Sequence, residues 1–304
     1  MSSENWAFET KQIHVGQNVD GDTGARALPI YQTTSFVFDS AETAANRFGL
    51  SDLGPIYTRI GNPTAQAVED RIAALEGGVG ALLLASGQAA TTFAILNVAQ
   101  AGDHIVASSA LYGGTYNLLH YTFPKLGIDV SFVDDPDDPQ SWRDAVRPNT
   151  KLFFAESTAN PLADILDVPA VAAVAHEEKV PFVVDNTVPT AALIRPLELG
   201  ADVVVASLTK FYTGNSTGIG GIAIDGGTFD WTVTRDEQPI GPVIITARTD
   251  ASACAADRSC SSRPDRAASA PSPSSWPSRS ARPSPSPPAA RKSSSAAANS
   301  APTS

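Results

Sequence analysis

Cysteine is nearly absent from this sequence of 304 residues. Its two copies, Cys254 and Cys260, lie near the C-terminal end, so residues 1–250 can form neither a disulfide nor a thiolate metal site. No metal-site spacing relates the four histidines, which are His14, His104, His120 and His176. We therefore predict no bound metal and a reducing compartment, the cytoplasm.

Long apolar runs are missing as well. No stretch approaches the roughly 18 apolar residues that a membrane helix requires. The segment 1–16 lacks the basic and apolar regions of an export signal. These two absences predict a soluble, unexported protein with no membrane partner.

Leu, Ile, Val and Phe are absent from residues 251–304, which contain 17 Ser, 14 Ala and 9 Pro. A hydrophobic core cannot form from this composition, so we predict a disordered tail over residues 241–304. GC-rich codons read out of frame yield these same residue types, which makes a frameshift one hypothesis and a natural tail the other. A strand at 243–248 is a further candidate, but no neighbouring pattern supports it.

Charge is divided unequally along the chain, whose net charge is −11. The tail at 251–304 holds seven basic and two acidic residues, whereas residues 1–250 hold 14 basic and 30 acidic ones. An acidic body repels phosphate backbones, which argues against a nucleic-acid partner. The acidic run Asp134–Asp138 is interpreted as a solvated turn before a helix, because it lacks a cation-loop spacing.

Short apolar runs alternate with helical periodicity from about residue 64, which predicts an α/β domain over 64–240 with a mostly parallel sheet. Residues 1–63 are rich in turns and polar residues and are interpreted as an arm. Thr64 and Asp167 are the expected N-caps of two helices. The predicted strands are 80–85, 103–107, 128–133, 151–156, 181–185, 202–206 and 219–224, and the predicted helices are 64–76, 88–100, 115–125, 140–146 and 168–178.

Ligands in such sheets bind where the parallel strands end, so the polar residues at those ends are the candidates for a site. Ser86-Gly87-Gln88 opens a helix directly after a strand, which would present free backbone N–H groups to a phosphate. A turn glycine with a capping serine is an equally good interpretation. Tyr112 offers a flat ring for stacking, or packs under a Gly-Gly turn.

Asp185 and Lys210 follow two consecutive strands, where an ionisable side chain needs a partner. One interpretation is a structural ion pair. The other is a site for pyridoxal phosphate, in which Lys210 forms a Schiff base and Asp185 keeps the ring nitrogen protonated. The hydroxyls of Ser207 and Thr209 would then face the phosphate. Arg59, beside Tyr57, is a candidate phosphate ligand or a surface residue.

Seven ordered motifs resemble the Cys/Met-metabolism family of pyridoxal-phosphate enzymes: YTRIGNPT, ALEGG, SGQAA, LYGGTYNLL, ESTANP, VVDNT and SLTKF. The resemblance covers about residues 7–232. Within the family, the segments 29–38, 147–157 and 219–231 look most like the O-acetylhomoserine sulfhydrylase branch. The implied fold is the large domain of a fold type I transferase. The small C-terminal domain of the family has no counterpart after about residue 240.

The resemblance also implies roles for the residues already singled out. Lys210 would be the cofactor lysine, with Asp185 as the pyridinium partner and Tyr112 as the stacking ring; Asn160 would lie near the ring hydroxyl or the substrate carboxylate. Ser86, Gly87, Gln88, Ser207 and Thr209 would bind phosphate. Tyr57 and Arg59 would reach the cofactor of a neighbouring subunit, so a homo-oligomer is expected, and Tyr57 could assist as acid or base.

The implied reaction is γ-replacement on O-acetylhomoserine by sulfide, or by another thiol, giving homocysteine and acetate. A cystathionine γ-synthase or a γ-lyase is the alternative within the family, because the cofactor site does not choose the nucleophile. An alternative of another class is an inactive fragment that at most binds the cofactor, since no substrate-binding arginine can be assigned in residues 241–304.

Overall fold

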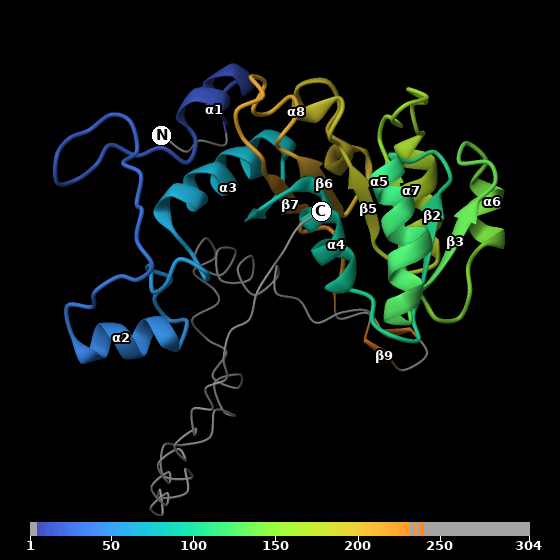
Figure 1. Ribbon diagram of the computed structural model, residues 1–304, viewed down its shortest axis with the longest axis horizontal. Helices are drawn as coiled ribbons and strands as arrows, with labels where there is room; N and C mark the ends of the chain where they lie inside the picture. Colours follow the sequence, from blue (N-terminus) through green and yellow to red (C-terminus); the bar gives the residue numbers. More distant parts are fainter. Residues whose placement is uncertain (1–4, 232–233, 236–237, 240–304) are drawn as a thin grey trace, which may run out of the picture. The chain divides into compact units, whose positions relative to one another are not determined.

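A seven-stranded sheet forms the centre of the computed structural model, which describes residues 5–231, 234–235 and 238–239 (Figure 1). The strand order is β1-β7-β6-β5-β4-β2-β3. β7 runs antiparallel to both of its neighbours, and the remaining pairs are parallel, which confirms the mostly parallel α/β fold. The strands are β1 (Gly80–Leu84), β2 (His104–Ser108), β3 (Asp129–Val133), β4 (Thr150–Glu156), β5 (Phe182–Asp185), β6 (Val203–Ser207) and β7 (Gly221–Asp225).

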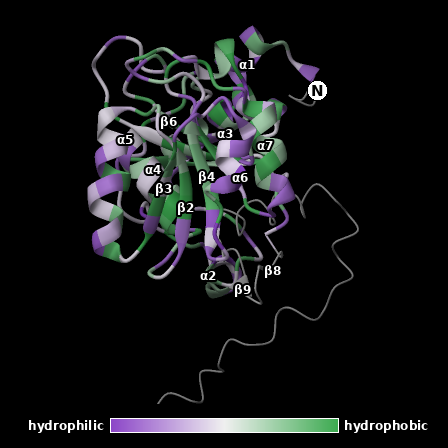
Figure 2. Cartoon of the chain, turned by 90° about the vertical axis from the view of Figure 1, so that its right-hand side faces the viewer, coloured by the Kyte–Doolittle hydropathy of each residue, from purple (hydrophilic) through white to green (hydrophobic). Residues whose placement is uncertain are grey.

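Helices cover both faces of this sheet, which explains why its central strands are buried. All seven residues of β4 are buried, as are all five of β2. Figure 2 shows α5 (Gly113–Asn117) on one side of the green strands and α6 (Pro139–Asp144) with α7 (Val168–Glu177) on the other. The further helices are α3 (Pro63–Glu76), α4 (Gly87–Leu96) and α8 (Thr190–Leu193), and a two-stranded ribbon is formed by β8 (Thr234–Arg235) and β9 (Gln238–Pro239).

The helix predicted over 115–125 is broken into three short pieces. α5 continues into a π-helical turn, Leu118–Thr122, and then into a 3-10 turn, Phe123–Leu126. Pro124 has no backbone N–H to donate, so the α-helical pattern cannot pass through it. A second 3-10 turn, Pro196–Leu199, was not expected from the sequence.

The N-cap of α3 differs from the expected one. Asn62, not Thr64, accepts the backbone N–H at the start of the helix, and Pro63 occupies the first turn. The Thr64 hydroxyl instead accepts the N–H of Tyr31. The expected cap of α7 is confirmed, because the Asp167 carboxylate accepts the N–H of Ala170.

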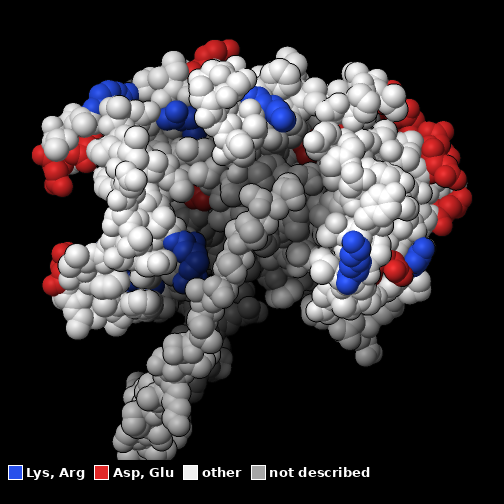
Figure 3. All heavy atoms as spheres, viewed as in Figure 1, with Lys and Arg blue, Asp and Glu red and all other residues white. Residues whose placement is uncertain are grey.

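The acidic turn at Asp134–Asp138 is exposed, and acidic side chains gather along the edge formed by α6 and β3 (Figure 3). Asp138 caps α6 by accepting the N–H of Gln140. Among the described residues, no group of three or more His, Cys, Asp or Glu side chains could hold a metal ion. None of the helices in this part of the chain is long and apolar enough to cross a membrane.

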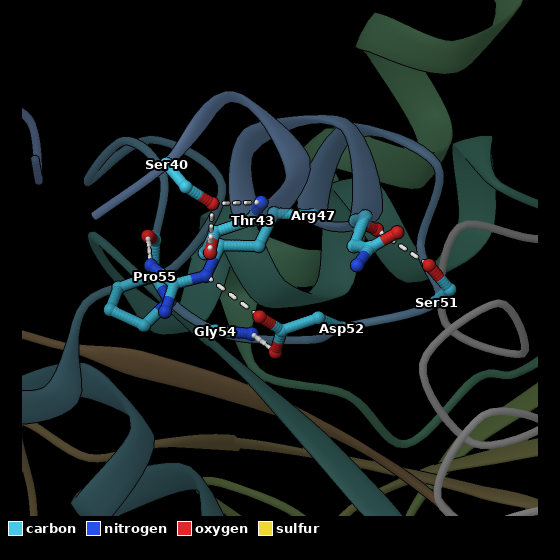
Figure 4. A network of polar contacts seen from close by, with 8 residues as sticks. Ser40, Thr43, Arg47, Ser51, Asp52, Gly54 and Pro55 are labelled. Carbon is cyan, nitrogen blue, oxygen red and sulfur yellow. Dashed lines mark hydrogen bonds and ion pairs between the residues drawn. The ribbon is translucent and has the colours of Figure 1, made fainter. Parts of the chain in front are cut away.

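The N-terminal arm contains two helices that the sequence did not reveal, α1 (Phe8–His14) and α2 (Ala41–Phe48). Around α2, the Arg47 guanidinium donates to the Asp52 carboxylate and to the Pro55 carbonyl, as Figure 4 shows. Asp52 in turn accepts the N–H of Gly54. These contacts hold residues 52–55, which follow α2, next to the end of the helix.

The described residues all fall in the first of two compact units, residues 1–258. The second unit, residues 259–304, lies outside the described part of the chain. The predicted tail at 241–304 and the candidate strand at 243–248 also lie outside it.

Candidate active site

The polar residues predicted to form a site follow the ends of strands that share one edge of the sheet. Leu84, the last residue of β1, and Ser207, the last residue of β6, both pair with Gly221 at the start of β7. β6, β5, β4 and β2 are parallel, so their carboxyl ends lie at this same edge. The topology therefore brings together segments that are up to about 120 residues apart in the chain.

The beginning of α4 lies against Ser207. A methyl group on Gly87 would come within 2.6 Å of the Ser207 Cβ, so the backbone can approach this closely only at a glycine. Ser86 caps the helix by accepting the N–H of Ala89. The N–H groups of Gly87 and Gln88 have no acceptor among the described residues, so two donors at a helix N-terminus remain available to an anion.

Asp185 is linked to this anion-binding end through Thr187. The Thr187 hydroxyl donates to Asp185 Oδ1 and accepts the backbone N–H of Ser207 at 2.8 Å. The Thr187 N–H also donates to Asp185 Oδ1, at 2.9 Å. Burial raises the pKa of Asp185, and the bonds from Thr187 oppose this rise. No donor contacts Oδ2 within the described part of the chain, so this oxygen can accept a proton donor from a ligand.

Lys210 lies in the turn after β6, three residues beyond Ser207, and its side chain is exposed. The expectation that an ionisable side chain at this position needs a partner to offset its burial therefore does not apply to Lys210. Its ammonium forms no ion pair with Asp185, and the described residues offer it no other ion-pair partner. The structural ion pair is thus excluded, and the amine is left for another function.

Glu156 is the residue of this edge that sequence reasoning passed over. It ends β4, pairs in register with Asp185 of β5, and is only 7% exposed. Its carboxylate accepts the N–H of Tyr112 at 2.7 Å and the N–H of Asn160 at 3.2 Å. Burial and the neighbouring Asp185 raise the pKa of Glu156 to about 7. The sequence did contain a signal, because Glu156 is the first residue of the ESTANP motif. The residue that pairs with it on the neighbouring strand, however, cannot be read from the sequence.

Tyr112 and Asn160 lie in the loops that follow β2 and β4. The Tyr112 ring is half-exposed and lies over Gly114, where a methyl group would approach its Cε1 to 2.5 Å. Tyr112 therefore packs on a glycine, as one of the two interpretations expected, and its side chain remains about half-exposed. The Asn160 side chain is exposed beside the same edge of the sheet.

Two predicted phosphate ligands are engaged elsewhere. The Thr209 hydroxyl donates to the Gly220 carbonyl and accepts the Gly220 N–H, which ties the turn containing Lys210 to the start of β7. Gln88 donates from its side chain to the Thr115 hydroxyl at 3.3 Å. Each of these side chains thus joins two segments of the site.

Tyr57 and Arg59 are not brought into contact with the other predicted site residues. Both are exposed in the arm, and the Arg59 guanidinium lies 5.6 Å from the centre of the Tyr57 ring. The arm is held by an isolated bridge between Ser35 and Tyr57. Within the part of the chain that the structure describes, the Tyr57 ring therefore contacts the Arg59 guanidinium of its own arm.

A second network of buried polar groups lies behind the site. Glu76, at the end of α3, is fully buried and accepts from the Asn186 amide and, at 2.8 Å, from the Tyr212 hydroxyl. Asn186 directly follows Asp185, and Tyr212 lies two residues after Lys210. Burial raises the pKa of Glu76 to about 7. The sequence did not point to this network.

The donor set at the edge of the sheet fits pyridoxal phosphate. Free N–H groups at Gly87 and Gln88, next to the Ser207 hydroxyl, suit a phosphate. A carboxylate oxygen of Asp185 suits a protonated ring nitrogen, and the unpaired amine of Lys210 suits an aldehyde. A groove of about 360 Å³ lies elsewhere, between the π-helical turn and β3, and none of these residues lines it.

Comparison with known proteins identifies a family model and curated proteins that match this chain. Residues 9–249 match the family model described as "Cys/Met metabolism PLP-dependent enzyme". The chain is 65% identical over 245 residues to the O-acetyl-L-homoserine sulfhydrylase of Corynebacterium glutamicum, covering 81% of this chain and 56% of that protein. It is 57% identical over 227 residues to the O-acetyl-L-homoserine sulfhydrylase of Leptospira meyeri, covering 75% and 51%.

A solved structure has the same fold. The crystal structure of an O-acetylhomoserine (thiol)-lyase from Campylobacter jejuni, which contains N'-pyridoxyl-lysine-5'-monophosphate, superimposes with a TM-score of 0.70 at 38% identity. The match covers 73% of this chain and 54% of that one. The chain spans about half the length of the curated relatives that it matches.

Proposed function

The chain belongs to the Cys/Met-metabolism family of pyridoxal-phosphate-dependent enzymes, and from this premise we propose that it performs γ-replacement on O-acetylhomoserine. Sulfide is the proposed nucleophile, and homocysteine and acetate are the products. The observation on which this proposal rests is the unpaired amine of Lys210 at the same sheet edge as Asp185 and the free N–H groups of Gly87 and Gln88.

We assign the binding roles as follows. The N-terminus of α4, with Ser86, Gly87 and Gln88, would hold the phosphate together with the hydroxyl of Ser207. Thr209, whose hydroxyl already donates to the Gly220 carbonyl, would instead fix the turn that contains Lys210. Asp185 would accept a hydrogen bond from the ring nitrogen through its free oxygen. Tyr112 would cover one face of the ring, and Asn160 would contact the ring hydroxyl or the substrate carboxylate.

The chemistry then divides between the cofactor and the side chains. When bound, pyridoxal phosphate supplies an electron sink that stabilises negative charge on the α and β carbons of an amino acid. Asp185 keeps positive charge on the ring nitrogen. Lys210 removes and returns protons at Cα and Cβ, acetate leaves Cγ, and sulfide forms the new bond to Cγ. Tyr57 is the proposed assisting acid or base.

A second copy of the chain is the proposed partner. Tyr57 and Arg59 are exposed and do not contact the remaining site residues of their own chain. Arg59 offers a planar pair of donors that suits two phosphate oxygens. We therefore propose that both residues complete the site of a neighbouring subunit in a homo-oligomer.

The test uses the full chain as printed. Purified protein incubated with pyridoxal phosphate should show the visible absorption band of the lysine-bound cofactor, and Lys210→Ala should abolish that band. Lys125→Ala, which removes an exposed lysine in the 3-10 turn, is the matched control and should keep the band. Homocysteine should form from O-acetylhomoserine and sulfide. A wild-type chain without the band would contradict the proposal.

A fragment that binds the cofactor without turnover is the second candidate. It is favoured by one observation, that the chain spans about half the length of the relatives it matches. The band without homocysteine would select this candidate. Release of ammonia from O-acetylhomoserine without added sulfide would instead select a γ-lyase, and cystathionine formed from added cysteine would select a cystathionine γ-synthase.

A further inference from the structure

The side chain of Glu156 joins the two loops that contain Tyr112 and Asn160. One carboxylate oxygen, Oε1, accepts the backbone N–H of Tyr112, and the other, Oε2, accepts the backbone N–H of Asn160. The two loops follow different strands, β2 and β4, and 48 positions separate these residues in the chain. A single buried group therefore determines where both loops start relative to Asp185, its partner in register on β5.

Only the ionised carboxyl can make both contacts equally well. A carboxylate offers two acceptor oxygens, whereas a protonated carboxyl turns one of them into a donor. An amide has a single acceptor oxygen and an NH2 group that would face a backbone N–H. Buried N–H groups need acceptors, so the loss of either oxygen leaves one loop without its tether.

We propose that Glu156 is a positioning residue, whose carboxylate holds Tyr112 and Asn160 in the geometry that binds the cofactor ring. It acts through the backbone of these two residues and does not itself contact the ring. This inference rests on the proposed function for its link to the cofactor. The tethering of the two loops stands on the hydrogen bonds alone.

The protonation state of Glu156 makes the tether sensitive to pH. Burial and the facing carboxyl of Asp185 raise its pKa to about 7, and the other groups that act on it are the two backbone N–H donors. The carboxylate therefore exists above about pH 7, and the tether weakens as the pH falls below that value. A side chain that cannot titrate removes this dependence.

Amide hydrogen exchange on the cofactor-free full chain is the first test. At about pH 8, Glu156→Gln should accelerate exchange at Tyr112 or Asn160 by about 10-fold or more, the loss expected for one hydrogen bond to a charged acceptor. In the wild type, the same acceleration should appear as the pH falls through about 7, after correction for intrinsic exchange. In the Gln variant this pH step should be absent. Unchanged protection at both amides would overturn the proposal.

Glu69→Gln is the matched control. Glu69 is also a buried carboxyl that accepts a backbone N–H, but it lies on α3 and its bond is to Leu83 of β1. It should leave exchange at Tyr112 and Asn160 unchanged. If both variants accelerate exchange at these two amides equally, the effect is a general loss of stability and the positioning role is refuted.

Cofactor affinity is the second test and separates this inference from the proposed function. Titration with pyridoxal phosphate, followed by its absorption and circular dichroism, should give about 10-fold weaker binding in Glu156→Gln than in the wild type. Equal affinity in both would overturn the positioning role while leaving the proposed function intact. Absence of cofactor binding in the wild type would refute the proposed function. The hydrogen-exchange result would still show whether Glu156 tethers the two loops.

Discussion

Gly221 is the residue at which two parts of the candidate site come closest. A Cβ atom added there would lie 1.9 Å from the carbonyl oxygen of Ser86, far inside any van der Waals contact. Gly221 also pairs with the last residues of β1 and β6. The smallest side chain at this position therefore permits the start of α4 to lie beside Ser207.

We predict that Gly221→Ala destabilises the protein strongly. The methyl group would have to displace backbone at Ser86 and Gly87, and overpacking of this kind costs about 1–3 kcal/mol or more. Chemical denaturation should show the loss in the free energy of unfolding. Gly21→Ala is the control, because nothing lies within 4 Å of a Cβ at that position, and it should change stability by less than about 1 kcal/mol. Equal effects of the two substitutions would contradict this account.

Sequence reasoning at the residue scale found the ionisable groups and missed how they are joined. Asp185 and Lys210 stand out because charged residues follow strands that are otherwise apolar. The roles of Glu156 and Thr187 become visible only once β4 is known to pair with β5, and β5 with β6. Pairing between strands depends on contacts that are distant in the chain, and a local pattern does not contain them.

At the scale of elements, α2 is held in place by polar contacts and has no buried residue. Ser40 caps the helix, and Arg47 bonds to Asp52 and to the Pro55 carbonyl (Figure 4). Pro55 lies two residues before Tyr57, so these bonds set the path of the chain toward one of the proposed catalytic residues. The apolar face of α2 spans only two turns and consists of alanines and Phe48, so it gives a weak sequence signal, which is why the arm was expected to be irregular.

We predict that Arg47→Met loosens this part of the arm without unfolding the sheet. Exchange of the amide hydrogens in residues 49–56 should become about 10-fold faster, because two hydrogen bonds from one guanidinium are lost. The global free energy of unfolding should change by less than about 1 kcal/mol. Hydrogen exchange with mass spectrometry measures the first quantity and chemical denaturation the second.

Arg143→Met provides the comparison for that experiment. Arg143 forms an ion pair with Glu177 between α6 and α7, so the substitution also removes an arginine–carboxylate contact. It should leave exchange in residues 49–56 unchanged. The interpretation of Arg47 would be wrong if both variants loosened the arm, or if Arg47→Met lowered global stability by several kcal/mol.

At the scale of the whole molecule, two buried glutamates contribute to how stability depends on pH, alongside Asp185, whose pKa is also raised by burial. Burial raises the pKa of both Glu76 and Glu156 to about 7, from the ordinary value of 4.5. The folded state therefore binds more protons than the unfolded state between about pH 4.5 and 7. Stability from these groups is fully present below that window and is lost as the pH rises through it.

We predict that the free energy of unfolding falls between about pH 4.5 and 7, by at most about 3 kcal/mol for each of the two groups. Glu76→Gln should make the fall shallower, because glutamine does not titrate. Denaturant titrations at several pH values measure the slope. Glu42→Gln, at an exposed position of α2, should keep the wild-type slope. A stability that rises over this interval would refute the assignment.

The sequence by itself determined the features that depend on neighbours in the chain. Apolar runs located the seven strands of the sheet, Asp167 marked the start of α7, and Gly77, with φ +84°, marks the end of α3. The ordered motifs were sufficient to identify the family. These signals are local because periodicity, capping and turn conformation act over a few residues.

Only the tertiary structure decided which of these local features meet. It placed Glu156 in register with Asp185, brought Gly87 against Ser207, and left Lys210 exposed, with no ion pair to any residue of the described ranges. It also replaced Thr64 by Asn62 as the cap of α3. Each of these outcomes depends on contacts between segments that are distant in the chain, and a local sequence pattern does not contain those contacts.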